Sequence, residues 1–300
     1  MRTQITFLWI LICGITFGQS HTEKLTREFS FEQASQSNTM IIANINGSVS
    51  VTGYTGSKIV VEIEKTIKAK TEQRLEKGKR ELTIGVIDRA DTIILHLNGL
   101  CNTFGQRKKN NWNRKRNAGW GYDWNGCDDD ENWRDNEGYD FKVNFTVKVP
   151  QGVNVHVSTV NDGDIDVENI QRTVVADNIN GSIRLKNIAG ATHANTINGD
   201  VDISYTKNPD QDCRYYSLNG DINANFKKGL SANLSFESFN GDLYTNVAKL
   251  ESLPVNVQKD TKSDHTRYKL TGNRFKIGAG GIHLDFETFN GNVYVKELEN

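Results

Sequence analysis

The sequence predicts an all-β protein built as a parallel, β-helix-like β-solenoid with coils of about 20 residues. The pattern apolar–Asn–Gly–(Asp/Ser/Asn)–apolar recurs at Asn46-Gly47, Asn180-Gly181, Asn198-Gly199, Asn219-Gly220, Asn240-Gly241 and Asn290-Gly291. A variant with one extra residue lies at Asn161-Asp162-Gly163, and from Gly163 onward the glycines of successive copies advance by 18, 18, 21 and 21 residues. A nearly fixed period of this kind indicates a stack of similar coils.

The Asn-Gly pair also allows a different fold. Both residues tolerate positive φ, so the pair is a strong signal for hairpin turns, and an antiparallel sandwich stays open. The near-constant spacing favours the solenoid, in which one Asn per coil forms a ladder of side-chain hydrogen bonds. The residues expected to point inward are Val201, Ile203, Leu234, Phe236 and Leu243.

Residues 1–18 read as a signal peptide. Arg2 precedes an apolar run from Ile5 to Ile15, and small residues then predict cleavage before Gln19. No later stretch is apolar for long enough to form a transmembrane segment. The remaining residues, 19–300, are expected to form a single solenoid domain that is exported to the periplasm or the cell surface of a bacterium.

The charge balance limits the partners. The chain has 36 Lys and Arg against 37 Asp and Glu, and loss of Arg2 with the signal peptide leaves a net charge of −2. Nucleic-acid and membrane-surface binders usually carry a basic excess, so neither partner is expected.

The elements are expected in the following order. Residues 24–67 contain strands, and Thr71–Leu82 form a short helix capped by Thr71 and limited to two or three turns by Gly78. Residues 82–87 and 92–97 form a hairpin. A strictly alternating strand at 141–149 stops at Pro150.

The second half continues with the Asn-Gly coils as far as residue 247. Residues 250–281 are expected to be irregular. The strand pair formed by 282–289 and 292–297 is expected to close the chain, and its polar end suits a cap on the stack.

Residues 98–138 read as a loop inserted into the scaffold. The four tryptophans outside the signal peptide all lie there, and with two arginines they form the candidate binding surface: Trp112, Trp120, Trp124, Trp133, Arg114 and Arg116. Trp and Arg often dominate binding energy, and Trp faces also stack on sugar rings. Two alternatives remain open, a loop folded back on the scaffold as a small core and a disordered loop.

Three cysteines follow the signal peptide. Cys101 and Cys127 bracket the inserted loop, and export to an oxidising compartment favours a disulfide between them. Such a bond would stabilise the fold by about 3–3.5 kcal/mol. Cys213 is left as a buried thiol or an intermolecular partner.

The run Phe145–Ile165, followed by the Asn-Gly-Asp coils, resembles the bacterial putative-adhesin domain family of unknown function. The resemblance covers about residues 40–97 and 139–297, and it implies a right-handed β-solenoid in an exported envelope protein. The family has no established catalytic residues, so none is carried over. The Trp-rich insertion is not a general feature of the family.

The aspartates of the coils, Asp164, Asp200, Asp221 and Asp242, are expected to cap turns. Calcium-binding solenoids repeat every nine residues, unlike this chain, and the histidines are scattered, so no metal site or other cofactor is expected. The predicted function is therefore non-catalytic adhesion or scaffolding at the cell envelope, toward an envelope protein or a glycan, with possible self-association. The alternative is a carbohydrate-active enzyme, a polysaccharide lyase or glycosidase, which would use paired carboxylates on a β-helix scaffold.

Overall fold

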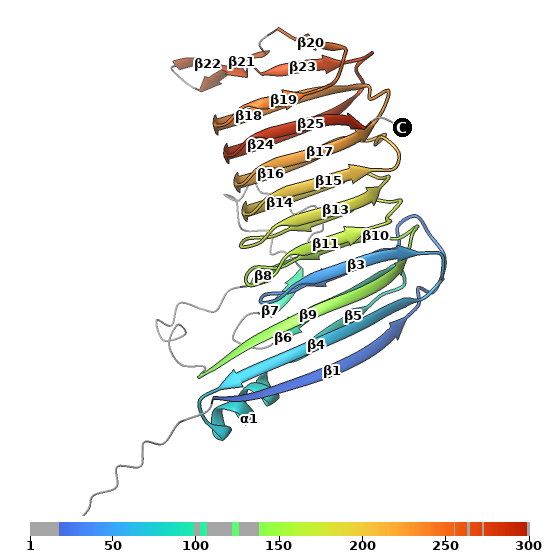
Figure 1. Ribbon diagram of the computed structural model, residues 1–300, viewed down its shortest axis with the longest axis vertical. Coiled ribbons are helices and arrows are strands. Elements are labelled where there is room, and N and C mark those ends of the chain that lie inside the picture. Colours follow the sequence, from blue (N-terminus) through green and yellow to red (C-terminus); the bar gives the residue numbers. More distant parts are fainter. Residues whose placement is uncertain are drawn as a thin grey trace, which may run out of the picture.

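A computed structural model describes residues 18–98, 103–106, 122–125, 138–254, 256–262, 265–271 and 273–298. These residues form two long sheets whose strands are stacked along the long axis of the molecule (Figure 1). The only helix among them lies at one end of the stack.

Sheet A has ten strands and sheet B has eleven. In spatial order sheet A contains β1 (Gln19–Phe29), β4 (Ile59–Ala69), β9 (Tyr139–Pro150), β3 (Val49–Tyr54), β11 (Ile165–Glu168), β13 (Ile183–Ile188), β15 (Val201–Tyr205), β17 (Ile222–Lys227), β25 (Val293–Leu298) and β19 (Leu243–Thr245). Sheet B contains β20 (Leu250–Ser252), β23 (Arg274–Ile277), β18 (Ala232–Asn240), β24 (Ile282–Asn290), β16 (Cys213–Asn219), β14 (Thr192–Asn198), β12 (Val174–Asp177), β10 (Asn154–Ser158), β2 (Thr39–Ala43), β6 (Thr92–Asn98) and β5 (Thr83–Asp88).

The chain alternates between the two sheets, and its coils stack in parallel. From β10 to β17 every even-numbered strand lies in sheet B and every odd-numbered strand in sheet A. Ile183 pairs with Val201, and Val201 pairs with Ile222, each in parallel register. The parallel solenoid is therefore confirmed, and the antiparallel sandwich is wrong for this part of the chain.

Inward-pointing side chains fill the space between the sheets. Val201, Ile203, Leu234 and Phe236 are buried as predicted, whereas Leu243 is only partly buried because β19 is the last strand of its sheet. Aromatic rings stack from layer to layer inside the core, with Tyr205 on Phe226 at 5.0 Å between ring centroids. This layered core gives each coil two neighbours to pack against.

Antiparallel strands close the N-terminal end. β1 pairs with β4, β4 pairs with β9, and β5 pairs with β6, which confirms the expected hairpin. The helix α1 (Glu72–Glu81) packs on β4, and Thr71 caps it by accepting a hydrogen bond from the backbone N–H of Arg74 at 3.4 Å. Gly78 does not end the helix; a Cβ there would lie 2.9 Å from Ile67 and Tyr139.

The order of the coils changes at the C-terminal end. β24 lies between β16 and β18, and β25 lies between β17 and β19. The expectation that residues 282–297 form a pair that caps the stack is therefore wrong, because the two strands lie in different sheets and form an inner layer. The sequence motif fixes the shape of this coil but not its place in the stack.

The stretch expected to be irregular also contains strands. β23 pairs antiparallel with β18 and with β20, and β21 (Asn256–Lys262) forms a two-stranded sheet with β22 (His265–Thr271). β20 and β23 extend sheet B beyond the last coil, whereas sheet A ends at β19. These short, polar strands lack the Asn-Gly motif, which explains why the repeat pattern did not reveal them.

Candidate functional site

The Asn-Gly motifs form one edge of the solenoid, where the chain passes from a sheet B strand to a sheet A strand. We call these turns the Asn-Gly corners. Their Asn side chains form the expected ladder, in which each Nδ2 donates to the Oδ1 of the layer below. The bonds are Asn161 to Asn46 at 3.3 Å, Asn180 to Asn161 at 2.8 Å, Asn198 to Asn180 at 2.8 Å, Asn219 to Asn198 at 2.9 Å, Asn290 to Asn219 at 2.8 Å and Asn240 to Asn290 at 2.9 Å.

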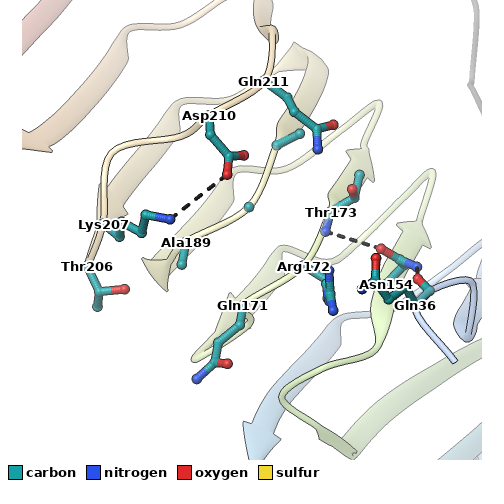
Figure 2. Close-up of a pocket in the computed structure, with 12 residues that line it drawn as sticks. Gln36, Asn154, Gln171, Arg172, Thr173, Ala189, Thr206, Lys207, Asp210 and Gln211 are labelled. Atoms are coloured by element: carbon teal, nitrogen blue, oxygen red, sulfur yellow. Dashed lines mark hydrogen bonds and ion pairs between the residues drawn. The ribbon is translucent and has the colours of Figure 1, made fainter. Parts of the chain in front are cut away.

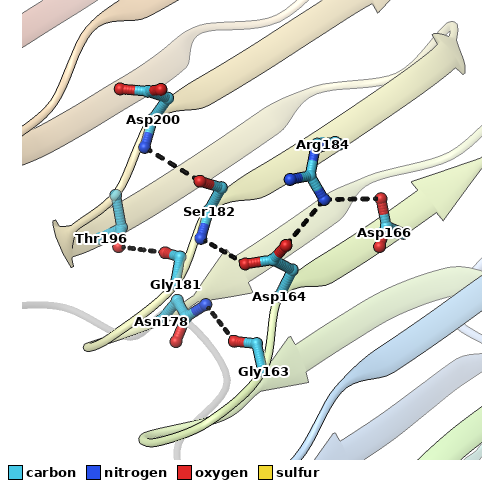
Figure 3. A network of polar contacts seen from close by, with 9 residues as sticks. All are labelled: Gly163, Asp164, Asp166, Asn178, Gly181, Ser182, Arg184, Thr196 and Asp200. Atoms are coloured by element: carbon cyan, nitrogen blue, oxygen red, sulfur yellow. Dashed lines mark hydrogen bonds and ion pairs between the residues drawn. The ribbon is translucent and has the colours of Figure 1, made fainter.

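A second ladder explains the Asp, Ser or Asn that follows each glycine. Its side-chain oxygen accepts a hydrogen bond from the backbone N–H of the equivalent residue in the next layer. Asp164 accepts from Ser182 at 2.9 Å, Asp200 accepts from Asp221 at 2.8 Å, and Asp221 accepts from Asn292 at 2.8 Å. These three aspartates therefore bond to the turn of the next layer, whereas Asp242, just before the last strand of sheet A, has no further layer to cap and donates its N–H to Asn292. Figure 3 shows one stretch of the ladder.

Hydroxyl and amide groups inside the corners form a third set of bonds. Thr196 and Ser217 donate to the carbonyl oxygens of Gly181 and Gly199 at 2.9 and 2.8 Å, and Asn178 donates to that of Gly163 at 3.0 Å. Buried carbonyl groups need such partners because water does not reach them. Each corner is therefore hydrogen-bonded on its inner and outer sides, which stiffens the edge of the solenoid.

The corner geometry gives the aspartates a structural role. Asp164 also pairs with Arg184 at 2.9 Å, and Asp166 lies 3.5 Å from the same guanidinium (Figure 3). A carboxylate that accepts hydrogen bonds from backbone N–H groups, or that pairs with an arginine, is held in one orientation by these contacts. Within the described residues no cluster of His, Cys, Asp and Glu has the arrangement of a metal site.

A serine, a histidine and an aspartate meet on sheet B. Ser235 Oγ lies 3.0 Å from His283 Nε2 and 2.5 Å from Asp285 Oδ1. A hydroxyl has one proton, and the bond to a charged carboxylate is the stronger one, so Ser235 donates to Asp285 and accepts from His283. The trio therefore joins β18 to β24.

The opposite edge carries the chain back from sheet A to sheet B, and it is hollowed. A groove of about 610 Å³ crosses the turns that precede β2, β10, β12, β14 and β16. Its lining is mostly polar and consists of Gln36, Asn154, Gln171, Arg172, Thr173, Ala189, Gly190, Ala191, Thr206, Lys207, Asp210 and Gln211 (Figure 2). The Asn-Gly motif gives no information about these turns, and sequence reasoning missed them.

A family model described as Toastrack DUF4097 matches residues 142–295, more than half of the chain. The chain belongs to the Toastrack DUF4097 family. The match covers the run of Asn-Gly corners from Asn161 to Asn290, and the resemblance to a domain family of unknown function is confirmed.

Two solved structures are similar to this Toastrack chain over most of its length. One is described as a "putative cell adhesion protein" from Clostridium sporogenes, with 9% identity, a TM-score of 0.42, and coverage of 93% of this chain and 100% of that chain. The other is a "putative adhesin" from Bacteroides fragilis, with 13% identity, a TM-score of 0.31, and coverage of 92% of this chain and 97% of that chain. No curated protein matches the chain.

The inserted loop is anchored on the Toastrack scaffold through its first residues. β7 (Thr103–Gln106) pairs with β8 (Tyr122–Asn125), and Phe104 is buried against Ile41, Ala43 and Ile94 on the outer face of sheet B. The Phe104 ring also stacks on His96 at 5.2 Å between ring centroids, and burial lowers the pKa of His96. Phe104 forms this contact, and the alternative in which the tryptophans fold back on the scaffold stays a prediction.

The predicted binding residues lie further along the loop. Trp112, Trp120, Trp133, Arg114 and Arg116 are outside the described residues, as are Cys101 and Cys127, so their proposed binding and pairing stay predictions. The backbone of Trp124 lies in β8, opposite Phe104. The structure therefore fixes where this loop leaves the scaffold.

Cys213 lies inside the core as a free, buried thiol, which confirms the first of its two predicted roles. Its Sγ accepts a hydrogen bond from the backbone N–H of Thr192 at 3.4 Å, and the Tyr205 hydroxyl lies 3.6 Å away. Burial raises the pKa of the thiol, so the reactive thiolate form is disfavoured.

Proposed function

We propose that this protein is a non-catalytic, exported component of the cell envelope, acting in adhesion or as a scaffold. The solenoid serves as a stiff stem, and the Trp- and Arg-rich loop at 98–138 serves as the contact surface. The observation that carries the proposal is the anchoring of the loop by Phe104 on the outer face of sheet B, away from the layers of the core.

The stem is suited to hold a contact surface in place. Hydrogen bonds join the Asn-Gly corners from Asn46 to Asn240, so the layers resist sliding past one another. Since the loop leaves from β6 in sheet B, its base is tied to this stiff stack. A fixed base reduces the entropy that the loop loses on binding.

The composition of the loop supports binding to a partner. Trp112, Trp120, Arg114 and Arg116 all lie between β7 and β8, and Trp and Arg are the residues that most often dominate interface energy. The partner is an envelope protein or a glycan, and self-association is a further outcome. Export rests on residues 1–18, and no helix in the described part of the chain has the length and apolar character to cross a membrane.

The pairing of β7 with β8 defines a clean test. Gln106 pairs with Tyr122, so residues 107–121 can be replaced by a two-residue Asn-Gly turn while Phe104 and its contacts remain. The intact protein and this variant are used as bait in envelope extracts of the source organism. A matched control keeps the full loop and changes Lys108, Lys109 and Lys115 to Gln, which removes charge but keeps every Trp and Arg.

The expected result is a partner that the intact protein and the lysine control capture and the shortened variant does not. Equal capture by the shortened variant would refute residues 107–121, with Trp112, Trp120, Arg114 and Arg116, as the contact surface. Capture by no bait would refute the binding role. Equal melting temperatures of all three proteins would show that a loss of capture does not come from unfolding.

A further inference from the structure

The groove on the opposite edge of the solenoid contains an arginine without a counterion. Arg172 is partly buried, and none of the described residues forms a hydrogen bond or an ion pair with its guanidinium (Figure 2). The other cation of the groove, Lys207, lies 3.9 Å from Asp210. By contrast, Arg184 and Arg214, on the two sheets, each lie within 4 Å of two carboxylates.

The rest of the lining consists of neutral hydrogen-bonding groups. Gln36, Gln171 and Gln211 contribute amides, and Thr173 and Thr206 contribute hydroxyls. These groups come from the turns before β2, β12 and β16, which are every second layer, so they recur at about 9.6 Å along the axis. Five layers contribute to the groove, which gives a polar strip about 19 Å long.

Small residues make the hollow. Ala189, Gly190 and Ala191 supply the turn before β14, where any larger side chain would fill the space. Gly190 lies so close to the backbone of Arg172 that an added Cβ would overlap the carbonyl oxygen of Arg172. The tight contact of these two layers holds the Arg172 backbone in place.

The main chain in this groove is already paired. The N–H groups of Gln171, Ala189 and Thr206 donate to carbonyls of neighbouring layers at 3.0, 3.0 and 2.8 Å. A peptide that binds by strand addition needs unpaired main-chain groups, so these turns do not favour it. Gln171 Nε2 already donates to Gln151 Oε1 at 3.1 Å and the Thr206 hydroxyl to the Ile188 carbonyl at 3.3 Å, so Thr206 keeps only its oxygen as an acceptor and the Gln171 amide keeps its oxygen and one N–H. With the remaining amides and the Arg172 guanidinium, these groups match the hydroxyls and carboxylate of an acidic sugar.

We propose that this groove binds a chain of carboxylate-bearing sugars, with the carboxylate on the Arg172 guanidinium. The planar fork of arginine matches a carboxylate through two parallel hydrogen bonds. The Gln and Thr side chains of every second layer meet the hydroxyls of every second sugar unit. This site is separate from the Trp-rich loop, and it does not depend on the proposed role of that loop.

The test measures binding of a galacturonic acid trimer to the full-length protein by calorimetry. The expected result is binding that weakens at least about tenfold for the methyl-esterified trimer and for Arg172→Gln, because each change removes a charge-assisted hydrogen bond. Arg172→Lys keeps the charge but loses the planar fork of arginine, so its affinity for the trimer is expected to lie between those of the wild type and Arg172→Gln. Arg184→Gln removes the same charge outside the groove and is expected to bind as the wild type does.

Several results would overturn the proposal. The wild-type protein could bind the esterified trimer, or poly-glutamate, as tightly as the free trimer. Arg172→Gln could bind the free trimer as tightly as the wild type does, or the wild type could fail to bind the trimer at all. Poly-glutamate distinguishes an acidic peptide from an acidic sugar. Thermal melting of each variant separates a loss of binding from a loss of fold, and the variant shortened at 107–121 is expected to keep its affinity for the trimer.

Discussion

Substituting Gly199 with alanine tests whether the glycine of the Asn-Gly corner is required by stacking. A Cβ at this position would overlap the carbonyl oxygen of Gly181 and approach the Ser182 nitrogen to 2.8 Å. These are backbone atoms, so the overlap is relieved only when two layers separate at the corner. Separation weakens the bonds from Gly181 N–H to the Asn198 carbonyl at 2.9 Å and from Thr196 to the Gly181 carbonyl at 2.9 Å.

The expected cost follows from these contacts. Loss of these two hydrogen bonds costs about 1 kcal/mol each, and overpacking adds about 1–3 kcal/mol. Gly199→Ala is therefore expected to lower the free energy of unfolding by about 3–5 kcal/mol.

Two other glycines provide matched controls. A Cβ at Gly152 meets nothing within 4 Å, so Gly152→Ala is expected to change stability by less than about 1 kcal/mol. Gly229 is equally open but has a φ of 86°, so Gly229→Ala isolates the cost of positive φ, about 1 kcal/mol. Urea unfolding monitored by circular dichroism and fluorescence gives the change in the free energy of unfolding for the three variants, provided that both probes report one transition. Equal losses for Gly199→Ala and Gly152→Ala would refute the stacking argument.

Three further predictions concern the ladder, the core and one histidine. Asn198→Ala removes two rungs of the ladder and is expected to cost about 2 kcal/mol in urea unfolding, about twice the cost of Asn240→Ala at its last rung. Cys213 is expected to react with a thiol reagent at pH 8 only after unfolding, measured by absorbance on a variant that lacks Cys101 and Cys127. Burial, aided by the charge of His193, lowers the pKa of His156 to about 4, so the unfolded state binds the extra proton between pH 6.5 and 4 and stability falls as the pH falls through this window. The loss is about 2 kcal/mol at pH 5 relative to pH 7, and His156→Asn is expected to flatten the profile of urea unfolding against pH.

Each of these predictions has a contradicting result. Equal costs for the two asparagine substitutions would show that the ladder does not act through its separate bonds. Rapid modification of Cys213 in the folded protein would contradict its burial. A pH profile that is the same in His156→Asn as in the wild type would assign the acid sensitivity to other groups.

The sequence was sufficient to predict the repeated layers because one short motif carries their geometry. Asn198, Gly199 and Asp200 each form a contact with the next or the previous layer, so the stacking of layers accounts for all three residue types at these positions. The inward positions followed from the alternation of strands, as Val201 and Ile203 show. The capping helix was equally clear from Thr71 and the composition that follows it.

Two features could not be predicted, and the reasons are physical. The position of the coil at 282–298 depends on which layer it pairs with, and all layers present the same Asn-Gly corner, so the motif does not distinguish them. The polar groove is formed by turns of different length, such as Ala189–Ala191 and Thr206–Gln211. Their lining shares no spacing in sequence, and only the stacking of the layers brings Gln36 and Gln211 to one groove.

One inner layer of the stack is built from a segment that follows, in sequence, the layer packed outside it. Synthesis runs from the N-terminus, so the layer of β18 and β19 emerges before the layer of β24 and β25 that separates it from β16 and β17. Early docking of β18 directly on β16 would bury the position that the last segment must occupy. A polypeptide that lacks residues 282–298 therefore cannot place β18 and β19 as they lie here, because the layer that separates them from β16 and β17 is missing.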